Sequence, residues 1–373
     1  MMKRCGGFLL LVTALVLPVF SPGGCSLAGT EVDRAPTGLT IASWNVQALF
    51  DGGDDGFEYA EYTSGAGWND AKYRARLNVL STAIHGGAGD EGFNPDILAL
   101  IEVEHSGVLR DLAELSGAEY GWTFFAGTPG SSIGLGVISR LPLAKTAAHS
   151  IYAAGDSIPR PVAEVWVESD AGPVVLLACH WKSKLGGEEA TERIRRAEAG
   201  IIVRRLEEIA ADHPGTPVVV LGDLNENYNE FQRTGGAYLC ALLPDNGEAA
   251  DLAAASGGGL RPGLQDYLII SRKKPPRTEF FESPVEASIL YSPWADSRSQ
   301  GSYYYDDAWE TIDHFLINPA LFDNRGWEYE NFWTLEEAPF TNAKGFPYAY
   351  NPKTGNGLSD HLPIVLSLRR SGP

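Results

Sequence analysis

The sequence is poor in cysteine, which excludes a fold that depends on a disulfide framework. Its 373 residues include only four cysteines, of which Cys5 and Cys25 lie in the N-terminal 25 residues. Cys179 and Cys240 remain, and Cys179 lies inside an apolar run, where a free thiol is more often a small core residue than half of a disulfide. We therefore expect a hydrophobic core to hold the fold together.

Positive charge is also scarce. The chain has 29 Lys and Arg against 48 Asp and Glu, which gives a formal net charge of −19. Proteins that bind nucleic acid over a wide surface neutralise phosphates with Lys and Arg, so the deficit argues against that class. A small basic groove around an active site remains compatible with it.

A long apolar run is missing as well. The stretch from Phe8 to Phe20 is too short to cross a bilayer comfortably as a permanent helix. Two basic residues precede it and small residues follow it, so residues 1–25 are predicted to be an export signal. Cys25, directly after two glycines, resembles the processing site of a bacterial lipoprotein, with plain signal cleavage as the alternative. We expect an exported protein, either secreted or anchored in the cell envelope by lipid.

The remaining chain contains no internal repeat and no low-complexity block. Residues 26–38 are predicted to form a polar tether, and residues 39–370 to form one domain, since α/β folds of two packed sheets commonly exceed 250 residues in a single core. Helices are expected from Asn69 or Asp70 to Gly86 and over 188–211, with the arginines of the second helix on a solvated face.

Polar side chains follow apolar runs wherever a strand is predicted to end. Asn45 ends the run 39–46, and Glu102 follows the apolar run 95–101. A buried carboxylate must bind a cation or hydrogen-bond donors, because burying it unpaired is costly. Glu102 is therefore a candidate metal ligand, and Asn45 offers an amide oxygen to the same cation or caps a turn.

Two further strands end in the same way. His180 follows the run 174–179, where it could donate to a phosphoryl oxygen, with Lys182 or Lys184 lending positive charge nearby. Gly222 lets the chain turn closely before Asp223 and Asn225, which could aim an acid at water and an amide at a phosphoryl group.

The C-terminal part adds an acid and a histidine. Asp313 begins an apolar run, and Asp360 directly precedes His361. An acid that orients an imidazole, with a second acid that holds a metal, is a working arrangement for hydrolysing phosphate esters. Arg160, at a strand start, could contact a phosphate or remain a solvated rim charge. The chain over 245–310 is expected to be rich in loops. Its cluster of aromatic residues, Tyr303, Tyr304, Tyr305 and Trp309, could form a substrate wall or pack internally, and we expect internal packing.

In chain order, these groups resemble the endonuclease/exonuclease/phosphatase superfamily, the metal-dependent phosphoesterases related to deoxyribonuclease I and exonuclease III. The combination of Gly-Asp-Leu-Asn at 222–225 with Ser-Asp-His-Leu-Pro at 359–363 carries the resemblance. Residues 45–51, 180–187 and 303–314 are similar to secreted bacterial members described as extracellular nucleases. Ile101 and His105 depart from the residues that many members have at these positions.

The resemblance implies a four-layer α/β sandwich, in which two mixed β-sheets pack face to face with helices outside. It implies that Asn45 and Glu102 hold Mg²⁺ or Mn²⁺ and that Asp360 contributes to metal or water binding. It further implies that Asp313 orients His361, which acts as general base or as a hydrogen-bond donor in the transition state.

Asp223 is the competing candidate for activating water, with Asn225 and His180 stabilising the developing charge, and Arg160 and Lys182 contacting substrate. The leading hypothesis is an exported, metal-dependent phosphodiesterase acting on DNA or RNA. A phosphatase or a phospholipase C-like enzyme acting on inositol phosphates or phospholipids is the alternative, and a surface lipoprotein without activity is a third. No feature of the sequence indicates an obligate protein partner.

Overall fold

The computed structural model describes residues 38–86, 93–117, 119–150, 152–153, 156–157, 160–245, 267–276 and 289–371. The chain divides into Met1–Pro36 and Thr37–Pro373. The predicted export signal and, except for Gly38, the predicted tether lie outside the described residues. Among the described helices, none combines the length and the apolar character that crossing a membrane requires.

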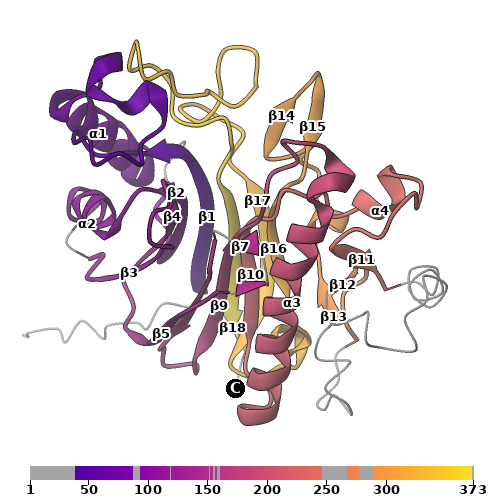
Figure 1. Cartoon of the computed structure of the whole chain (residues 1–373). Helices are drawn as coiled ribbons and strands as arrows, with labels where there is room; N and C mark the ends of the chain where they lie inside the picture. Colours follow the sequence, from indigo (N-terminus) through magenta and orange to yellow (C-terminus); the bar gives the residue numbers. More distant parts are fainter. Residues whose placement is uncertain are drawn as a thin grey trace, which may run out of the picture. The chain divides into compact units, whose positions relative to one another are not determined.

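Two large sheets form the centre of the second unit (Figure 1). From edge to edge, the six-stranded sheet contains β17 (Trp327–Thr334), β18 (Ile364–Arg370), β1 (Gly38–Leu49), β2 (Ile97–Val103), β4 (Gly134–Ser139) and β3 (Trp122–Ala126). Strands β1 and β2 are parallel, whereas β18 runs antiparallel to β1. The sheet is therefore mixed.

The second sheet has eight strands. Its order is β11 (Leu242–Pro244), β12 (Leu268–Ser271), β13 (Ile289–Tyr291), β16 (Asp313–Ile317), β10 (Val218–Asp223), β9 (Val174–His180), β8 (Val162–Val167) and β5 (Leu143–His149). Two small hairpins join β14 (Tyr303–Tyr305) to β15 (Ala308–Glu310) and β6 (Tyr152–Ala153) to β7 (Asp156–Ser157). The region 245–310, expected to be rich in loops, thus contributes two strands to this sheet.

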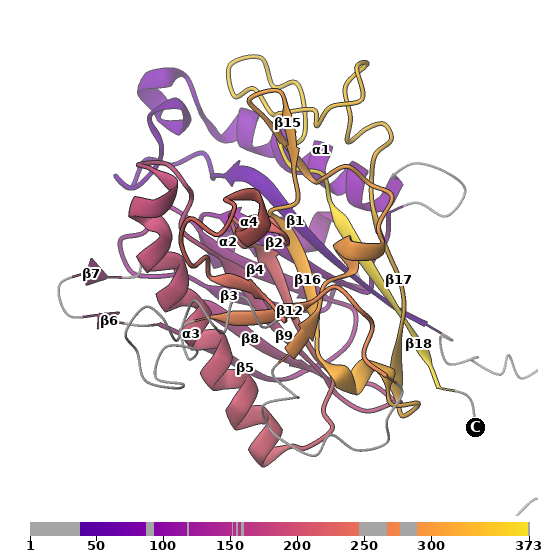
Figure 2. The same cartoon turned by 90° about the vertical axis from the view of Figure 1, so that its right-hand side faces the viewer.

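Helices cover the outer faces of both sheets (Figures 1 and 2). Helices α1 (Asp70–Gly86) and α2 (Ser106–Leu115) lie on the six-stranded sheet, and α3 (Glu188–Asp212) lies on the eight-stranded one. The short helices are α4 (Glu230–Arg233), η1 (Ala60–Tyr62), η2 (Ser64–Ala66), η4 (Pro293–Asp296) and η5 (Pro319–Phe322). Asn69 caps α1 by accepting hydrogen bonds from the amides of Ala71 and Lys72.

Three hydrophobic clusters fill the spaces between these layers. One lies between the two sheets, one under α1 and α2, and one under α3. Three interfaces between four layers are what a four-layer α/β sandwich requires, so the predicted fold is confirmed. Cys179 and Cys240 are both buried and free, in agreement with the expectation of a core without a disulfide.

The alternation of side chains along each strand decides what faces the other sheet. In β1, Leu39 and Ile41 pack between the sheets, whereas Trp44 and Val46 pack under the helices. Asn45 therefore continues the inward row of β1. The inward rows of four strands end in buried polar residues, namely Asn45, His180, Asp223 and Asp313.

The expectation that the arginines of α3 are all solvated is wrong for Arg195. This side chain is fully buried and pairs with Glu192 at 2.7 Å and with Glu226 at 2.9 Å. Glu226 also accepts hydrogen bonds from the amides of Ala241 and Leu242. The buried guanidinium thus joins α3 to the segment that follows β10, a long-range pairing that helical spacing does not reveal.

We expect Gly222→Ala to lower the free energy of unfolding by about 3 kcal/mol or more. Gly222 has φ of +123°, and a Cβ atom there would lie 2.0 Å from the carbonyl oxygen of Cys179 on the paired strand β9. Gly215→Ala is the matched control, because Gly215 also has a positive φ, +78°, but open space around it. Its cost should be about 1 kcal/mol. Equal losses for both variants in urea denaturation would contradict this account.

Candidate functional site

The polar ends of the inward rows meet at one edge of the two sheets, near the β14–β15 hairpin (Figure 1). In the eight-stranded sheet, Asp223 pairs with His180 on β9 and with Asp313 on β16. Across the gap between the sheets, the amide nitrogen of Asn45 donates to Asp223 Oδ2 at 3.0 Å. The structure therefore brings together groups that are far apart in the sequence.

His361 is held by a buried acid. Its Nδ1 donates to Asp313 Oδ2 at 2.8 Å, and the same oxygen accepts from the hydroxyl of Ser302 at 2.6 Å. Asp313 Oδ1 is buried without a hydrogen-bond partner in the described part of the chain. This pairing fixes the imidazole and directs Nε2 toward Asp223, whose Oδ2 lies 4.0 Å away.

Asp223 is the centre of the group. Its Oδ2 lies 3.7 Å from His180 Nε2, and its Oδ1 accepts from the backbone amide of Asn225 at 3.0 Å. Burial, ahead of the nearby charges of Asp313 and Glu102, raises the pKa of Asp223 to about 7. A carboxyl with such a pKa can exchange a proton near neutral pH.

The two histidines are shifted in opposite directions. Burial lowers the pKa of His180 well below its usual value, and the positive charge of Arg160 adds to this. Burial also disfavours the charged form of His361, but the Asp313 carboxylate, with help from Asp360 and Asp223, outweighs it and raises the pKa to about 10. His361 is therefore a cation at neutral pH, whereas His180 is neutral.

Glu102 reaches the site through a break in the regular pleat. Ile101 packs between the sheets, so strict alternation would turn the next side chain toward α1 and α2. Glu102 instead has φ of +70°, and the register with both neighbouring strands shifts at this point. Its carboxylate thus lies 3.1 Å from the amide nitrogen of Asn45 and 3.7 Å from His180 Nε2.

Asn45 is oriented by the bulged end of β1. Its Oδ1 accepts from the backbone amide of Gln47 at 3.0 Å, which leaves Nδ2 toward Glu102 and Asp223. In this arrangement the amide is a donor to both carboxylates. Its expected role as an oxygen ligand of a cation requires the amide to turn over, and it stays a prediction.

Asp360 approaches from the loop before β18. Its backbone amide donates to Gln47 Oε1 at 3.1 Å, and its side chain is half-buried. The pKa of Glu102 is raised, first by burial and then by the negative charge of Asp360. The negative charge that Asp360 places beside Glu102 is compatible with binding of a hard divalent cation, and the assignment of both residues as metal ligands stays a prediction.

Asn225 and Arg160 converge on one carbonyl. Both donate to the carbonyl oxygen of Trp181, Asn225 Nδ2 at 3.0 Å and Arg160 Nη1 at 2.7 Å. Asn225 has φ of +52°, so the chain leaves the strand geometry after Asp223. Arg160, predicted to bind substrate, and Asn225, predicted to be catalytic, are thus held by the same carbonyl.

The two lysines that follow β9 differ in their partners. Lys182 Nζ donates to the backbone carbonyl of Ser183 at 3.2 Å, whereas Lys184 pairs with Glu230 at 2.9 Å. Lys182 is half-buried, and burial together with the charge of Arg160 lowers its pKa. Among the residues that the structure describes, no acid lies within salt-bridge distance of the Lys182 ammonium group, whereas Glu230 holds that of Lys184.

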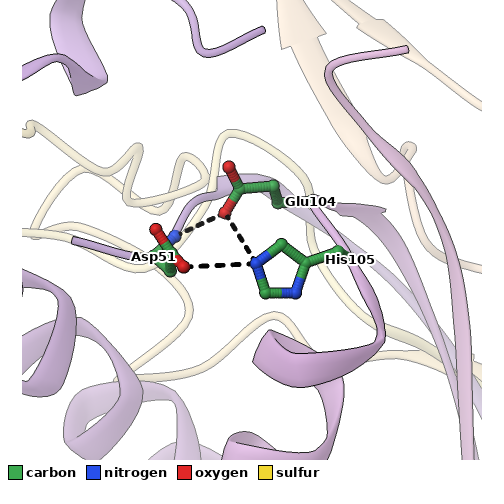
Figure 3. A group of neighbouring side chains, drawn as sticks. All are labelled: Asp51, Glu104 and His105. Atoms are coloured by element: carbon green, nitrogen blue, oxygen red, sulfur yellow. Dashed lines mark hydrogen bonds and ion pairs between the residues drawn. The ribbon is translucent and has the colours of Figure 1, made fainter. Parts of the chain in front are cut away.

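A second group of potential metal ligands, Asp51, Glu104 and His105, has a different explanation (Figure 3). His105 Nδ1 accepts from the amides of Gly107 and Val108 at the start of α2. Its Nε2 therefore carries the proton and points toward Asp51 at 3.2 Å and Glu104 at 3.7 Å. This trio is satisfied by hydrogen bonds, and His105 caps α2.

The site can be compared with known proteins. A sequence model described as the Endonuclease/Exonuclease/phosphatase family matches residues 40–239, which is more than half of the 373-residue chain. The chain belongs to this family. Its members hydrolyse phosphate esters, so the chain is a hydrolase of phosphate ester bonds, and the resemblance predicted from the sequence is confirmed. A search of curated protein sequences finds no match.

Solved structures share the fold of this family. Truncated Caenorhabditis elegans TDP2 has a TM-score of 0.50 at 15% identity, and the alignment covers 89% of this chain and 97% of that one. An endonuclease/exonuclease/phosphatase family protein from Bacteroides thetaiotaomicron has a TM-score of 0.49 at 14% identity, and the alignment covers 90% of this chain and 95% of that one. The mannosyl-6-phosphatase Bt3783 of Bacteroides thetaiotaomicron has a TM-score of 0.47 at 14% identity, and the alignment covers 88% of this chain and 99% of that one. At such identities the likeness concerns the fold alone.

Sequence reasoning did not find every residue of the site. Ser302 donates to Asp313, and the ring of Tyr303 stacks on that of His361 with centroids 4.5 Å apart. Gln47 connects Asn45 to the loop that carries Asp360. No spacing signal precedes Ser302, and the three consecutive tyrosines were the one visible sign of a functional role for Tyr303.

We expect the wild type to lose stability as the pH rises, and we expect the Glu198→Gln variant not to show this loss. Glu198 on α3 is almost fully buried, accepts from the Lys182 amide at 2.8 Å, and burial raises its pKa to about 8. Between an unfolded pKa of about 4.3 and this value, the native state binds more protons than the unfolded state, so stability falls with rising pH.

Relative to the wild type, the Glu198→Gln variant should therefore gain up to about 3 kcal/mol between pH 5 and pH 8. Urea denaturation at each pH measures this difference. Glu207→Gln, at an exposed position of the same helix, is the control and should change stability by less than about 0.5 kcal/mol at every pH. A difference between wild type and Glu198→Gln that does not change with pH would refute the assignment.

Proposed function

We propose that this chain is an exported, Mg²⁺- or Mn²⁺-dependent phosphodiesterase that hydrolyses nucleic acid. The observation that carries the proposal is the convergence of Asp223, His361, His180 and Glu102 on one space at the edge of the two sheets. That space is bordered by acids and histidines, which can bind a metal ion and move protons during hydrolysis of a phosphodiester.

The electrostatics support a division of labour between Asp223 and His361. Because Asp313 keeps His361 protonated, its Nε2–H is suited to donate a hydrogen bond to a phosphoryl oxygen. Asp223, with a pKa of about 7, is suited to accept the proton of the attacking water. Of the two general bases that the sequence left open, we therefore favour Asp223.

The neighbouring neutral groups complete the arrangement. His180 is held neutral by burial, so it can donate one hydrogen bond without adding charge. Asn225 is fixed by the Trp181 carbonyl and has a second amide hydrogen available for a phosphoryl oxygen. A divalent cation bound by Glu102 and Asp360 would supply charge neutralisation and Lewis acidity to the phosphate.

Local positive charge supports a polyanionic substrate. Although the chain as a whole has a net charge of −19, Arg160 donates to the same Trp181 carbonyl as Asn225, and Lys182 follows Trp181 directly. A small basic rim on an acidic protein attracts a phosphate chain locally and limits binding elsewhere. The same net charge keeps a phosphatase or phospholipase C-like activity on inositol phosphates or phospholipids as the second candidate.

Export rests on the N-terminal sequence. Basic residues, the apolar stretch 8–20 and a cysteine after small residues support an export signal, with lipid attachment at Cys25. Metabolic labelling with a radioactive fatty acid, in cells that express wild type or Cys25→Ser, distinguishes a lipoprotein from a secreted enzyme.

The soluble domain should nick plasmid DNA in Mg²⁺ or Mn²⁺ and lose this activity in EDTA. His361→Ala should reduce kcat by about 10²- to 10⁴-fold, because the hydrogen-bond donor to the phosphoryl oxygen is removed. His85→Ala, at an exposed position of α1, is the matched control and should retain full activity.

A substrate panel separates the two candidate functions. It contains duplex DNA, single-stranded DNA, RNA, sphingomyelin and inositol phosphates, each with and without chelator. Hydrolysis of a lipid or inositol phosphate without any cleavage of DNA or RNA would reject the nuclease and support the second candidate.

A further inference from the structure

The β14–β15 hairpin next to the site is short and tightly specified. Asp306 and Asp307 form its turn, with φ of +47° and +60°, as the two central residues of a tight hairpin turn require. Tyr303 and Tyr305 lie two positions apart on β14 and therefore on one face, whereas Tyr304 lies on the other. The two faces of the hairpin make different contacts.

The Tyr304 face anchors the hairpin. The ring of Tyr304 stacks on Phe346 with centroids 4.1 Å apart, and it meets Trp309 on β15 edge-on at 5.3 Å. These contacts tie the hairpin to the loop that follows β17. The expectation of internal packing holds for this face.

On the other face, the rings of Tyr303 and Tyr305 form a row that starts at His361. The ring of Tyr303 stacks on His361 at 4.5 Å with 29° between the planes, and the ring of Tyr305 stacks on Tyr303 at 6.1 Å with 9° between the planes. The amide of Leu362 donates to the carbonyl of Ser302 at 2.7 Å, so the hairpin is bound directly to the segment of His361. Three nearly parallel rings thus extend from the catalytic histidine toward the turn.

Tyr305, at the outer end of this row, is 64% exposed. A single exposed aromatic side chain needs no explanation by itself. This one differs because it continues a stack that begins at His361, on a hairpin whose opposite face is anchored. Its ring therefore lies beside Tyr303, which contacts His361, and remains accessible to a ligand.

The charges around Tyr305 indicate what that ligand is. Asp306 and Asp307 follow it directly, and Glu310 lies opposite Tyr303 on β15. These acids repel a phosphate group, but they do not repel the flat face of an uncharged ring. Stacking on an exposed aromatic side chain is how proteins hold unpaired bases of any sequence, because each base has a π face.

We propose that Tyr305, supported by Tyr303, is a stacking subsite for an unpaired nucleobase of the strand whose phosphodiester faces His361. This subsite makes the enzyme prefer single-stranded or frayed nucleic acid over a closed duplex, in which the bases already stack on each other. The inference rests on the proposed nuclease function and adds the substrate form to it.

The test compares two single-stranded substrates with the same backbone: an eight-nucleotide oligothymidylate and an octamer of abasic tetrahydrofuran residues. The enzyme is the soluble domain with Mn²⁺. Wild type should have the higher kcat/KM on oligothymidylate, mainly through KM. Tyr305→Ala should lower that value about tenfold and leave the abasic octamer unchanged, while Tyr305→Phe retains wild-type values.

Trp122→Ala is the matched control, because Trp122 is also exposed but pairs with Ser139, at the end of β4 away from the site. The kcat/KM of this variant should equal that of the wild type on both octamers. If wild type cleaves DNA but Tyr305→Ala affects both octamers equally, or neither, the stacking subsite is rejected and the nuclease function stands. If wild type cleaves neither octamer nor plasmid DNA yet hydrolyses an inositol phosphate, both proposals fail together.

Discussion

Two sheets packed face to face leave only two directions for each side chain of a strand, and this constraint governs the molecule. One direction leads into the gap between the sheets, the other to the helices outside. The gap is filled with apolar side chains along its length and closed at one edge by polar ones. Because that edge is formed by both sheets, a group on β1 such as Asn45 contacts a group on β10 such as Asp223 without any flexible loop between them. The positions of these two groups are therefore fixed by the packing of the two sheets.

The site gathers negative charge, because Glu102, Asp223, Asp313 and Asp360 lie close together. Within the described residues, the partners of these acids are mainly two histidines and the amide of Asn45. Burial raises the free energy of the Glu102 and Asp223 carboxylates. Protons, a cation or a substrate would offset this cost. The gathered acids therefore favour binding of a cation or substrate, and they lower the stability of the protein without a ligand. This relationship is common in sites that work by electrostatic preorganisation.

Much of this could be predicted from the sequence, because the relevant information is local. His180 and Asp223 end apolar runs, and a period of two places them in the inward rows. Glu102 was found as a polar residue after a strand, but not the left-handed backbone that turns it inward, since no residue preference signals a bulge at a glutamate. Arg195 and Ser302 depend on partners 31 and 11 positions away in the sequence, so only the assembled fold reveals them. Long-range contacts of polar side chains are what the pattern could not supply.

The place of β18 in the first sheet has a consequence for how the protein is made. The last strand of the domain lies between β17 and β1, with Gly38 opposite Arg369, so the first strand lacks one of its two neighbours until synthesis has nearly finished. Contacts of such high sequence separation form slowly. A nascent chain of this topology therefore cannot complete its six-stranded sheet until its most C-terminal strand has been made.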